Sequence, residues 1–457
     1  MRHVKKYVVE RRSMFSFPFK FHISGFRIIF LGFAGVILLG ALILMLPFAS
    51  ADGTFTNFSD TLFTATSAVC VTGLVIADTG STWSVWGKAI ILGLIQIGGL
   101  GVVTTAVSIT MFSGRRIDLM QRSVLQESMS AAQLGGIVRL TLFIIRVTVA
   151  AELIGASLMY PVYRIAYGNK RAVFISLFHS VSAFCNAGFD LTGTKNSPFV
   201  SLTGFAAEPV VNIVIMLLII TGGIGFLTWD DIHKYHLHID RYRLQSKIVL
   251  TVTLILIFLP AVFFYFYEYA DLPVGNRVLA SLFQSVTTRT AGFNTTDLTT
   301  LSDTAKMMMI LLMLIGGSSG STAGGMKVTT FAVLFAACIG VFRHRSSTNL
   351  FQRSISETII RKAAAIFLMY IALFLSSAMI ISCIENLPIL PCMFETASAL
   401  ATVGLTLGIT PGLSLVSRFI LIMLMFFGRV GGLTIIYAAV GTKYDVSKYP
   451  HEDIAVG

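Results

Sequence analysis

The chain alternates between long apolar runs and more polar linkers. A helix needs about 20 apolar residues to cross the hydrocarbon core of a bilayer, and eight runs are long enough. They lie near residues 25–48, 85–112, 138–163, 209–229, 248–268, 305–342, 363–384 and 415–441. A membrane β-barrel would instead show alternating segments of about ten residues. The pattern therefore predicts an all-α membrane protein with eight transmembrane helices.

Composition excludes a soluble protein and a disordered one. Of the 457 residues, 55% are hydrophobic and 12% are charged, whereas soluble domains carry about 25% charged residues. Disordered chains have low hydrophobicity, which is the opposite of what this chain has. The net charge of +12 is assigned to segments that face the anionic cytoplasmic leaflet, and not to nucleic-acid binding.

Basic linkers predict the orientation of the chain in the cell membrane. They precede the first, third, fifth and seventh runs, at 1–22, 115–116, 234–247 and 343–362. Because cytoplasmic loops are enriched in Lys and Arg, we expect both termini to be cytoplasmic. One linker departs from this rule, since the segment 164–195 carries Arg164, Lys170, Arg171 and Lys195.

Each of the other linkers contains an apolar stretch of about a dozen residues, which is too short to span. Stretches of this length are typical of re-entrant segments, whose non-helical backbone must be buried in protein or line an aqueous cavity. We therefore predict four repeats of helix, pore loop and helix, with four re-entrant pore helices around a central ion pore. The repeats cover 1–134, 135–240, 241–346 and 347–457.

The four short stretches align with one another. Each begins with a Phe and ends at a Gly, with a Ser or Thr between: Phe63 to Gly73, Phe178 to Gly188, Phe283 to Gly292 and Phe394 to Gly404. Gly adopts left-handed dihedrals that can turn carbonyl oxygens toward an axis. Rings of carbonyls replace the hydration shell of a cation in a potassium filter. The alternative is four ordinary helix–glycine–turn connections.

These features resemble the Trk/Ktr/HKT superfamily of potassium transporters. The resemblance covers nearly the whole chain, favours the KtrB-like subgroup and is carried by FTATSAVCVTGL, SVSAFCNAGF, SVTTRTAGFNT and GGSSGSTAGGMK. It implies a bacterial membrane subunit that takes up potassium, with sodium as a possible activating ion. It also implies a homodimer with one pore in each protomer.

The resemblance also implies a partner, a cytoplasmic ring of KtrA-like nucleotide-binding regulatory subunits. The chain itself has no GxxxxGK[ST] motif, which is the loop that cradles nucleotide phosphates. We therefore expect no cofactor and no enzymatic activity in this chain.

By the same resemblance, the selectivity filter is the last three residues of each stretch. We expect potassium to bind at these residues and at no others. They are Val71, Thr72, Gly73, Asn186, Ala187, Gly188, Thr290, Ala291, Gly292, Thr402, Val403 and Gly404. None of the four segments reads TVGYG, as tetrameric potassium channels do. We therefore expect a shorter and less regular stack of carbonyl rings.

An interruption of the sixth run predicts a gate. Its centre reads Gly316, Gly317, Ser318, Ser319, Gly320, Ser321, Thr322, Ala323, Gly324 and Gly325. Because Gly costs ~1 kcal/mol in a helix interior, we expect this stretch to unwind and to obstruct the pore on the cytoplasmic side of the filter, as the resemblance also implies. The alternative is a close contact between helices made by small residues. We favour that interpretation for the glycine pairs at 98–99, 222–223 and 431–432.

Arg429 lies inside the last apolar run. A charge near the bilayer centre costs ~2.5–3.5 kcal/mol on insertion scales and usually faces a polar interior. We predict that Arg429 points into the pore, bonds the 316–325 loop and forms an electrostatic barrier to a cation. An arginine that reaches to the membrane interface is the alternative.

Other ionisable groups lie within the apolar runs or near their ends. Four carboxylates near the extracellular ends either concentrate cations or are solvated loop charges: Asp78, Asp190, Asp297 and Glu395. Arg289 is expected to brace the filter from behind. Arg146 and Glu152 share one apolar run. They are either buried partners of each other or groups at an interface.

Two other functions are alternatives to a gated pore. A secondary cation transporter would bind its ion at the midplane, but such folds usually contain two inverted repeats. An intramembrane hydrolase would need a nucleophile and a base on facing helices, and it would leave the fourfold repeat unexplained.

Overall fold

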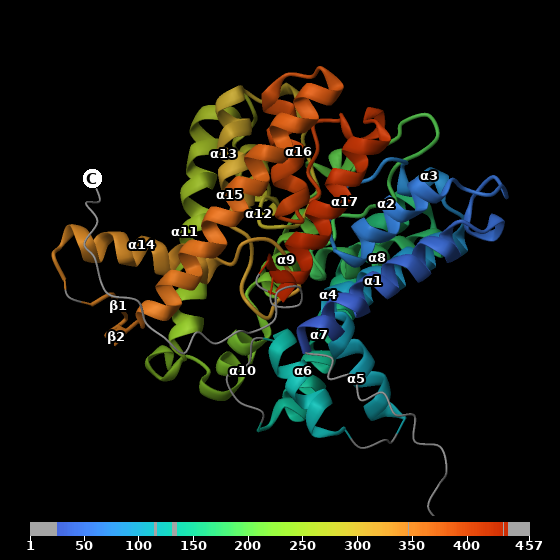
Figure 1. Ribbon diagram of the computed structural model, residues 1–457. Helices are drawn as coiled ribbons and strands as arrows, with labels where there is room; N and C mark the ends of the chain where they lie inside the picture. The colour runs from blue at the N-terminus through green and yellow to red at the C-terminus, as the bar shows by residue number, and fades with distance from the viewer. Residues whose placement is uncertain (1–24, 114–116, 130–134, 346, 433, 437–457) are drawn as a thin grey trace, which may run out of the picture.

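The computed structural model describes residues 25–113, 117–129, 135–345, 347–432 and 434–436, and most of its regular structure is helical (Figure 1). In chain order the elements are α1 Gly25–Leu44, η1 Pro47–Ala49, α2 Phe58–Val69, α3 Thr79–Thr82, α4 Val85–Leu100, α5 Val102–Phe112, α6 Leu119–Met129, α7 Ile137–Tyr167, α8 Asn169–Phe184, η2 Thr203–Phe205, α9 Pro209–Gly223, α10 Phe226–Tyr235, η3 Ile239–Arg241, α11 Leu244–Phe263, η4 Phe264–Glu268, α12 Val274–Thr287, η5 Leu298–Thr300, α13 Asp303–Leu314, α14 Val328–Phe342, β1 Asn349–Leu350, β2 Arg353–Ser354, α15 Glu357–Glu385, α16 Ile389–Leu400, η6 Thr410–Gly412 and α17 Leu415–Val430. The predicted cytoplasmic termini lie outside the described residues.

Four sets of helices are arranged in a cycle. Each set consists of an outer helix, a shorter helix that packs against it, a loop and an inner helix: α1, α2 and α4; α7, α8 and α9; α11, α12 and α13; and α15, α16 and α17. The inner helix of each set also contacts the short helix of the next, as α4 does with α8, α9 with α12, α13 with α16, and α17 with α2. The last contact closes the cycle.

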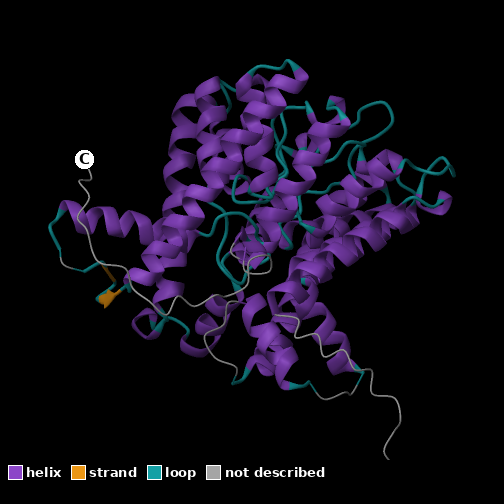
Figure 2. Cartoon of the chain, viewed as in Figure 1, coloured by secondary structure: helices purple, strands orange, loops and turns teal. Residues whose placement is uncertain are grey.

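Non-helical backbone occupies the middle of this bundle. Figure 2 shows several loops running through the centre, surrounded by helices. They include the segments that follow α2, α8, α12 and α16, and the connection between α13 and α14. Backbone without helical hydrogen bonds is tolerated at this depth only where protein or a water-filled cavity surrounds it.

Serine side chains fix where three of the inner helices begin. Ser84, Ser302 and Ser414 stand before α4, α13 and α17, and each hydroxyl accepts a hydrogen bond from the backbone three residues later. An N-cap of this kind satisfies one of the amide groups that a helix start leaves unpaired. The start of these three inner helices is therefore encoded locally.

Two of the predicted spanning runs contain a sharp bend. The angle between α4 and α5 is 96°, and that between α9 and α10 is also 96°. The bends lie at Gly101 and Gly225, which have φ values of 89° and 92°. Glycine adopts such dihedrals without the steric cost that a Cβ brings. The runs 85–112 and 209–229 are therefore not single straight helices.

Among the residues that the structure describes, length and apolarity identify three single helices that could cross a membrane. They are α1, α11 together with η4, and α15; each bent pair would add a further span if it is counted as one, for a total of up to five. The remaining predicted runs correspond to α7, to α13 with α14, and to α17. The count of eight spans stays a prediction.

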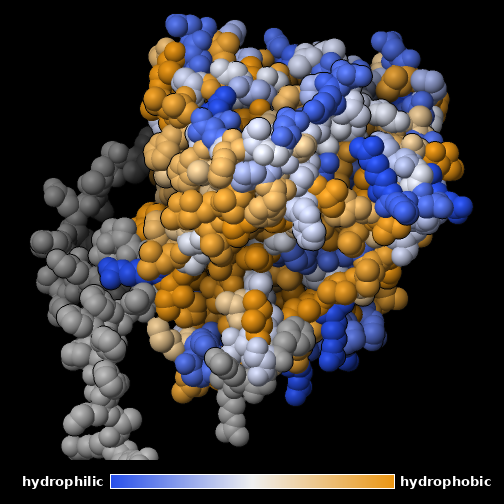
Figure 3. All heavy atoms as spheres, turned by 90° about the vertical axis from the view of Figure 1, so that its right-hand side faces the viewer, coloured by the Kyte–Doolittle hydropathy of each residue, from blue (hydrophilic) through white to orange (hydrophobic). Residues whose placement is uncertain are grey.

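The surface carries the apolar belt that a lipid environment requires. In Figure 3 a broad hydrophobic band crosses the face, and hydrophilic residues gather above and below it. Exposed leucines on α1 belong to this apolar surface, among them Leu31 and Leu39 at 58% and 60% exposure. A monomeric soluble protein rarely exposes so large an apolar surface.

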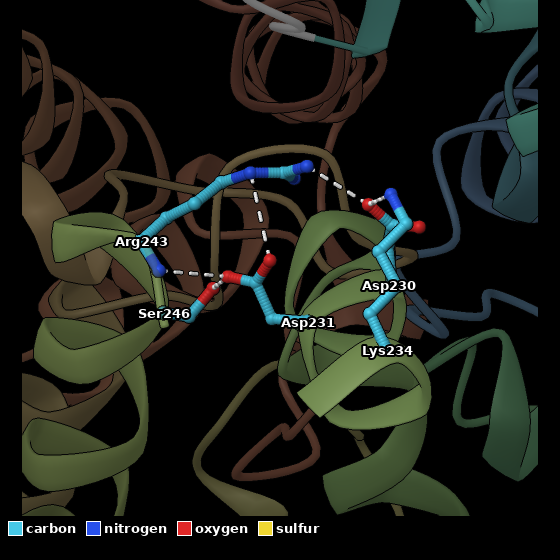
Figure 4. Close-up of polar contacts among 5 residues, drawn as sticks. All are labelled: Asp230, Asp231, Lys234, Arg243 and Ser246. Carbon is cyan, nitrogen blue, oxygen red and sulfur yellow. Dashed lines mark hydrogen bonds and ion pairs between the residues drawn. The ribbon is translucent and has the colours of Figure 1, made fainter. Parts of the chain in front are cut away.

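An ion-pair cluster ties α10 to α11 (Figure 4). Asp231 is fully buried, and its Oδ2 accepts hydrogen bonds from the Arg243 amide at 3.0 Å and the Ser246 hydroxyl at 2.6 Å. Asp230 accepts from Lys234 at 2.7 Å and from the Arg243 guanidinium at 2.8 Å. These contacts close the predicted basic linker 234–247 into a compact turn.

Candidate functional site

The four predicted filter glycines form a closed ring of contacts. A Cβ atom added at each would lie between 2.0 and 2.7 Å from a backbone oxygen of the next repeat, too close for any side chain. The pairs are Gly73 with Ala187, Gly188 with Ala291, Gly292 with Val403, and Gly404 with Thr72. The order is that of the chain, and the fourth loop returns to the first. Eight of the twelve predicted filter residues therefore take part in one ring.

The remaining four predicted filter residues all adopt the left-handed conformation. Val71, Asn186, Thr290 and Thr402 have φ values between 49° and 65°. Such values are uncommon for residues other than glycine and are strained for a β-branched residue. Three of the four are β-branched, so each loop holds a conformation that the surrounding packing must impose.

Hydroxyl groups of the pore helices hold the loops in this shape. The Ser67 and Ser398 hydroxyls accept hydrogen bonds from the amides of Gly73 and Gly404, both at 3.0 Å. In the other two repeats the hydroxyl donates to the carbonyl after the glycine. These bonds join Ser182 to Phe189 at 2.7 Å and Thr287 to Phe293 at 2.5 Å. The Ser or Thr that the four stretches share thus has the same partner segment in each.

The predicted gating segment is non-helical. Helix α13 ends at Leu314 and α14 begins at Val328, and the ten residues 316–325 lie between them. The Ser318 amide donates to the Gly223 carbonyl at 3.0 Å, and the Gly325 amide donates to the Gly428 carbonyl at 3.2 Å. The loop is therefore held between the inner helices α9 and α17.

This loop lies directly against two of the predicted filter segments. The Thr322 hydroxyl lies 3.0 Å from the Phe184 carbonyl and 3.2 Å from Oδ1 of Asn186. A Cβ added at Gly324 would lie 1.9 Å from Oγ1 of Thr402. Only a residue without a side chain fits there, which is a physical reason for the glycine.

Arg429 reaches the same loop from α17. Its Nη1 donates to the Thr322 carbonyl, and its Nη2 donates to the carbonyls of Gly98 and Gly99 at 2.5 and 3.0 Å. The guanidinium thus donates hydrogen bonds to backbone oxygens of the 316–325 loop and of the last turn of α4. The structure brings Arg429 and the 316–325 loop together.

The sequence contained a further sign of this arrangement that the prediction missed. Gly98-Gly99 on α4 and Gly222-Gly223 on α9 both stand three and two residues before a bend glycine. The equivalent pair on α17 is Gly428-Arg429, before Gly431 with φ 90°, and not the pair at 431–432. Arg429 therefore occupies the place that a glycine holds in two other repeats.

A cavity of about 270 Å³ adjoins the loop and Arg429. Its lining includes Gly320, Lys327 and Arg429, together with Gly101 and Gly431 at the helix bends. The Lys327 ammonium donates to the Ala323 carbonyl at 2.9 Å. Two cations therefore border the space on the side of the loop away from the filter segments.

All four predicted mouth carboxylates have hydrogen-bond partners. Asp78 is buried and accepts from the Phe199 amide and the Ser81 hydroxyl at 2.9 and 2.7 Å. Glu395 is fully buried, so neither is a solvated loop charge. Hydrogen bonds from the Thr299 hydroxyl and amide hold the pKa of the exposed Asp297 below its usual range. Asp190 stands two residues after Gly188 and is half-buried, and it accepts from the Thr192 hydroxyl at 2.8 Å and from the Thr192 amide at 3.2 Å.

Glu395 belongs to a set of buried anchors that sequence reasoning did not identify. It follows the shared Phe394, and it accepts from the Leu407 amide at 3.1 Å and the Thr410 hydroxyl at 2.9 Å. His179 follows Phe178 in the same way and accepts from the Leu191 amide at 3.0 Å. These residues tie the chain beyond the filter back to the pore helix. A polar residue after each shared Phe was the available signal.

The other predicted positions are more dispersed. Arg289 is buried and directly precedes Thr290, and its backbone oxygen accepts from Asn186 at 3.2 Å; its role as a brace stays a prediction. Glu152 is buried on α7, where its backbone oxygen accepts from Ser180 at 2.6 Å. Arg146 is exposed, and no ion pair joins it to Glu152 among the ion pairs of the described residues.

Comparison with known proteins gives a consistent result. Residues 25–444 match the model of the TrkH family, described as cation transport protein. The chain is 38% identical over 437 residues to Ktr system potassium uptake protein B of Bacillus subtilis, covering 94% of this chain and 96% of that protein. It is 36% identical over 447 residues to potassium/sodium uptake protein NtpJ of Enterococcus hirae, covering 95% and 98%.

The fold is similar to that of the potassium transporter TrkH from Vibrio parahaemolyticus. The TM-score is 0.72 over 92% of this chain and 86% of that one, at 18% sequence identity. The family match spans the helices, the four filter segments and the central loop alike. The chain therefore belongs to the TrkH family of cation transport proteins.

Proposed function

We propose that the chain takes up potassium through a pore whose selectivity filter is formed by the four loops. The observation that carries the proposal is the closed ring of contacts among Gly73, Gly188, Gly292 and Gly404. Four strained loops that meet around one axis can present rings of carbonyl oxygens to a dehydrated cation. The names of the relatives, potassium uptake protein B and potassium/sodium uptake protein, support potassium as the transported ion and sodium as an activating ion.

The 316–325 loop and Arg429 act as the gate in this proposal. The loop lies against Asn186 and Thr402, and the guanidinium of Arg429 holds the Thr322 carbonyl. A fixed cation close to a pore raises the energy of a passing cation. Opening requires the loop to leave the filter, with the loss of these hydrogen bonds.

The proposal extends to assembly and orientation. The relatives are named as parts of a Ktr system, which supports a complex with a ring of KtrA-like regulatory subunits. A homodimer with one pore per protomer, and cytoplasmic termini, complete the proposal.

A pair of glycine variants tests the filter. Gly404 and Gly408 have φ values of 92° and 88°, so an alanine is strained equally at both. A Cβ at Gly404 would lie 2.0 Å from the Thr72 carbonyl, whereas nothing lies within 4 Å of one at Gly408. We expect Gly404→Ala to lose potassium-over-sodium selection and Gly408→Ala to keep it.

The measurement is uptake of each ion by a host that lacks its own potassium uptake, with equal protein in the membrane. Unchanged selection in Gly404→Ala would refute the filter assignment. Unitary currents in a planar bilayer distinguish the pore from a secondary cation transporter with a midplane site, which would show none.

A further inference from the structure

A groove of about 450 Å³ lies where α4 and α8 begin, away from the pore. Three cationic side chains line it, namely Lys88, Lys170 and Arg171. Its floor is apolar and includes Phe174, Ile175 and Leu191. Two of the cations belong to the linker 164–195, whose positive charge the orientation of the chain does not explain.

The surroundings of the groove are those of a lipid-facing surface. Trp86 and Val173 are 70% and 58% exposed, and Ile165 is 90% exposed. Tryptophan and tyrosine gather at the level of lipid headgroups, and Tyr167 stacks beneath Arg171, whose guanidinium carbon lies 5.6 Å from the ring centre. The groove therefore combines an aromatic border, cations and an apolar floor.

The cations are available to a ligand. Lys170 is exposed, and no hydrogen bond or ion pair joins its ammonium group to another residue that the structure describes. Lys88 donates to the Gly80 carbonyl at 2.6 Å, which uses one of its three N–H groups. The nearby carboxylate of Asp78 is occupied by Ser81 and Phe199. Helix α8 also begins at Gly168 without a side-chain cap, which adds partial positive charge.

We propose that this groove binds one anionic phospholipid, with the phosphodiester at Lys170, Arg171 and Lys88 and an acyl chain over Phe174 and Ile175. Charge complementarity selects an anionic headgroup, because three cations and no carboxylate line the groove. Basic pockets between membrane helices are known to hold such headgroups. The occupant is a lipid of the leaflet in which the pore helices begin.

Such a lipid would also brace the filter. Leu191 on the groove floor is the third residue after the filter Gly188, and its amide donates to His179 at 3.0 Å. Leu191 lines the groove and is 3% exposed, so a lipid chain in the groove would lie against the residue whose amide is bonded to His179. Occupancy is therefore expected to stabilise the second filter segment.

The test measures lipid binding by the full chain in detergent and does not depend on transport. Native mass spectrometry counts retained dioleoyl phosphatidylglycerol or dioleoyl phosphatidylcholine, and thermal unfolding is followed with each lipid and with inorganic phosphate. The groove variant is Lys170→Ser with Arg171→Ser. The charge-matched control is Lys195→Ser with Arg361→Ser, which removes two exposed cations paired elsewhere with Asp52 and Glu357.

We expect wild type and control to retain phosphatidylglycerol and to gain thermal stability from it. Each cation near a lipid surface contributes about fivefold in affinity, so the groove variant should bind ~30-fold more weakly. Lys170→Glu alone, at an exposed site that cannot disturb the core, should weaken binding at least as much as Lys170→Ser. Unchanged ion selection in Gly404→Ala would refute the filter proposal and leave this one standing, because lipid retention is measured without transport.

Several results would overturn the proposal. One is equal retention of phosphatidylglycerol by the groove variant and wild type. Another is equal stabilisation by phosphatidylcholine, which would mean that the cations do not choose the headgroup. Equal stabilisation by inorganic phosphate would replace the lipid by a free anion. A groove variant that dissociates from dimer to monomer with lipid retention unchanged would assign the groove to contact between two copies.

Discussion

Arg429 on α17 donates a hydrogen bond from Nη1 to the backbone oxygen of Thr322, which lies 107 positions earlier in the chain. The same guanidinium donates from Nη2 to the Gly98 and Gly99 carbonyls on α4. One side chain therefore joins the central loop to two inner helices. Its removal would free three carbonyls at once, so we expect this side chain to help hold the loop in place.

Replacement of Arg429 is expected to favour the open pore. In Arg429→Ala the loop loses a charge-assisted hydrogen bond worth ~2 kcal/mol, and we expect resting potassium uptake to rise by about tenfold or more. Arg429→Lys should lie between wild type and Arg429→Ala, since an ammonium cannot span both partners as a guanidinium does. The measurement is rubidium or potassium flux into liposomes that contain the purified chain.

Arg361→Ala serves as the control, because Arg361 is an exposed cation paired only with Glu357. It should leave flux unchanged. If Arg429→Ala also leaves both flux and its regulation as in wild type, Arg429 is not part of the gate.

The serine hydroxyls behind two filter loops are expected to contribute to both stability and selection. Ser67→Ala and Ser398→Ala each remove the acceptor of a buried glycine amide. An unsatisfied buried amide costs ~1–3 kcal/mol, so the unfolding temperature in detergent should fall by several degrees and sodium exclusion should weaken.

A matched control is Ser376→Ala on α15, whose exposed hydroxyl bonds only to carbonyls of its own helix. We expect it to behave as wild type in thermal unfolding and in ion competition. A drop of the same size in all three variants would contradict a specific role for Ser67 and Ser398.

Loss of the Glu395 carboxylate should loosen the segment beyond the fourth filter loop. Glu395→Ala leaves the Leu407 amide and the Thr406 and Thr410 hydroxyls without their acceptor. We expect a loss of ~2–4 kcal/mol of unfolding free energy and weaker ion selection, measured by chemical denaturation and by uptake. Glu357→Ala, at an exposed residue, should change neither, and equal effects of the two would disprove the anchor.

The cluster between α10 and α11 should affect stability without altering selection. Asp231→Asn keeps one oxygen for the Arg243 amide and the Ser246 hydroxyl, but it removes the charge and places an NH2 group where Oδ1 faces the Arg243 guanidinium, at a cost of ~1.5–3 kcal/mol. We expect a lower unfolding temperature and an unchanged preference for potassium. Asp303→Asn, at a carboxylate that is 83% exposed, is the control. A change in ion preference in Asp231→Asn would show that this turn reaches the filter.

Membership of the family and the location of the central break could be predicted from local sequence. Family membership followed from the motifs, and the glycines of 316–325 predicted the break because glycine weakens a helix wherever it occurs. The bends at Gly101 and Gly225 were missed, because an apolar run continues through both. Periodicity and apolarity do not report a left-handed dihedral.

The sequence by itself determined that the chain is a helical membrane protein with four related segments, because apolarity and the shared Phe, Ser or Thr and Gly are local properties. Only the tertiary structure decided which groups meet. It joined Gly404 to Thr72 and Arg429 to Thr322, and it turned Glu395 from a mouth charge into a buried anchor. These contacts link segments separated by hundreds of residues or by whole helices. They depend on the packing of one repeat against the next, which no local pattern specifies.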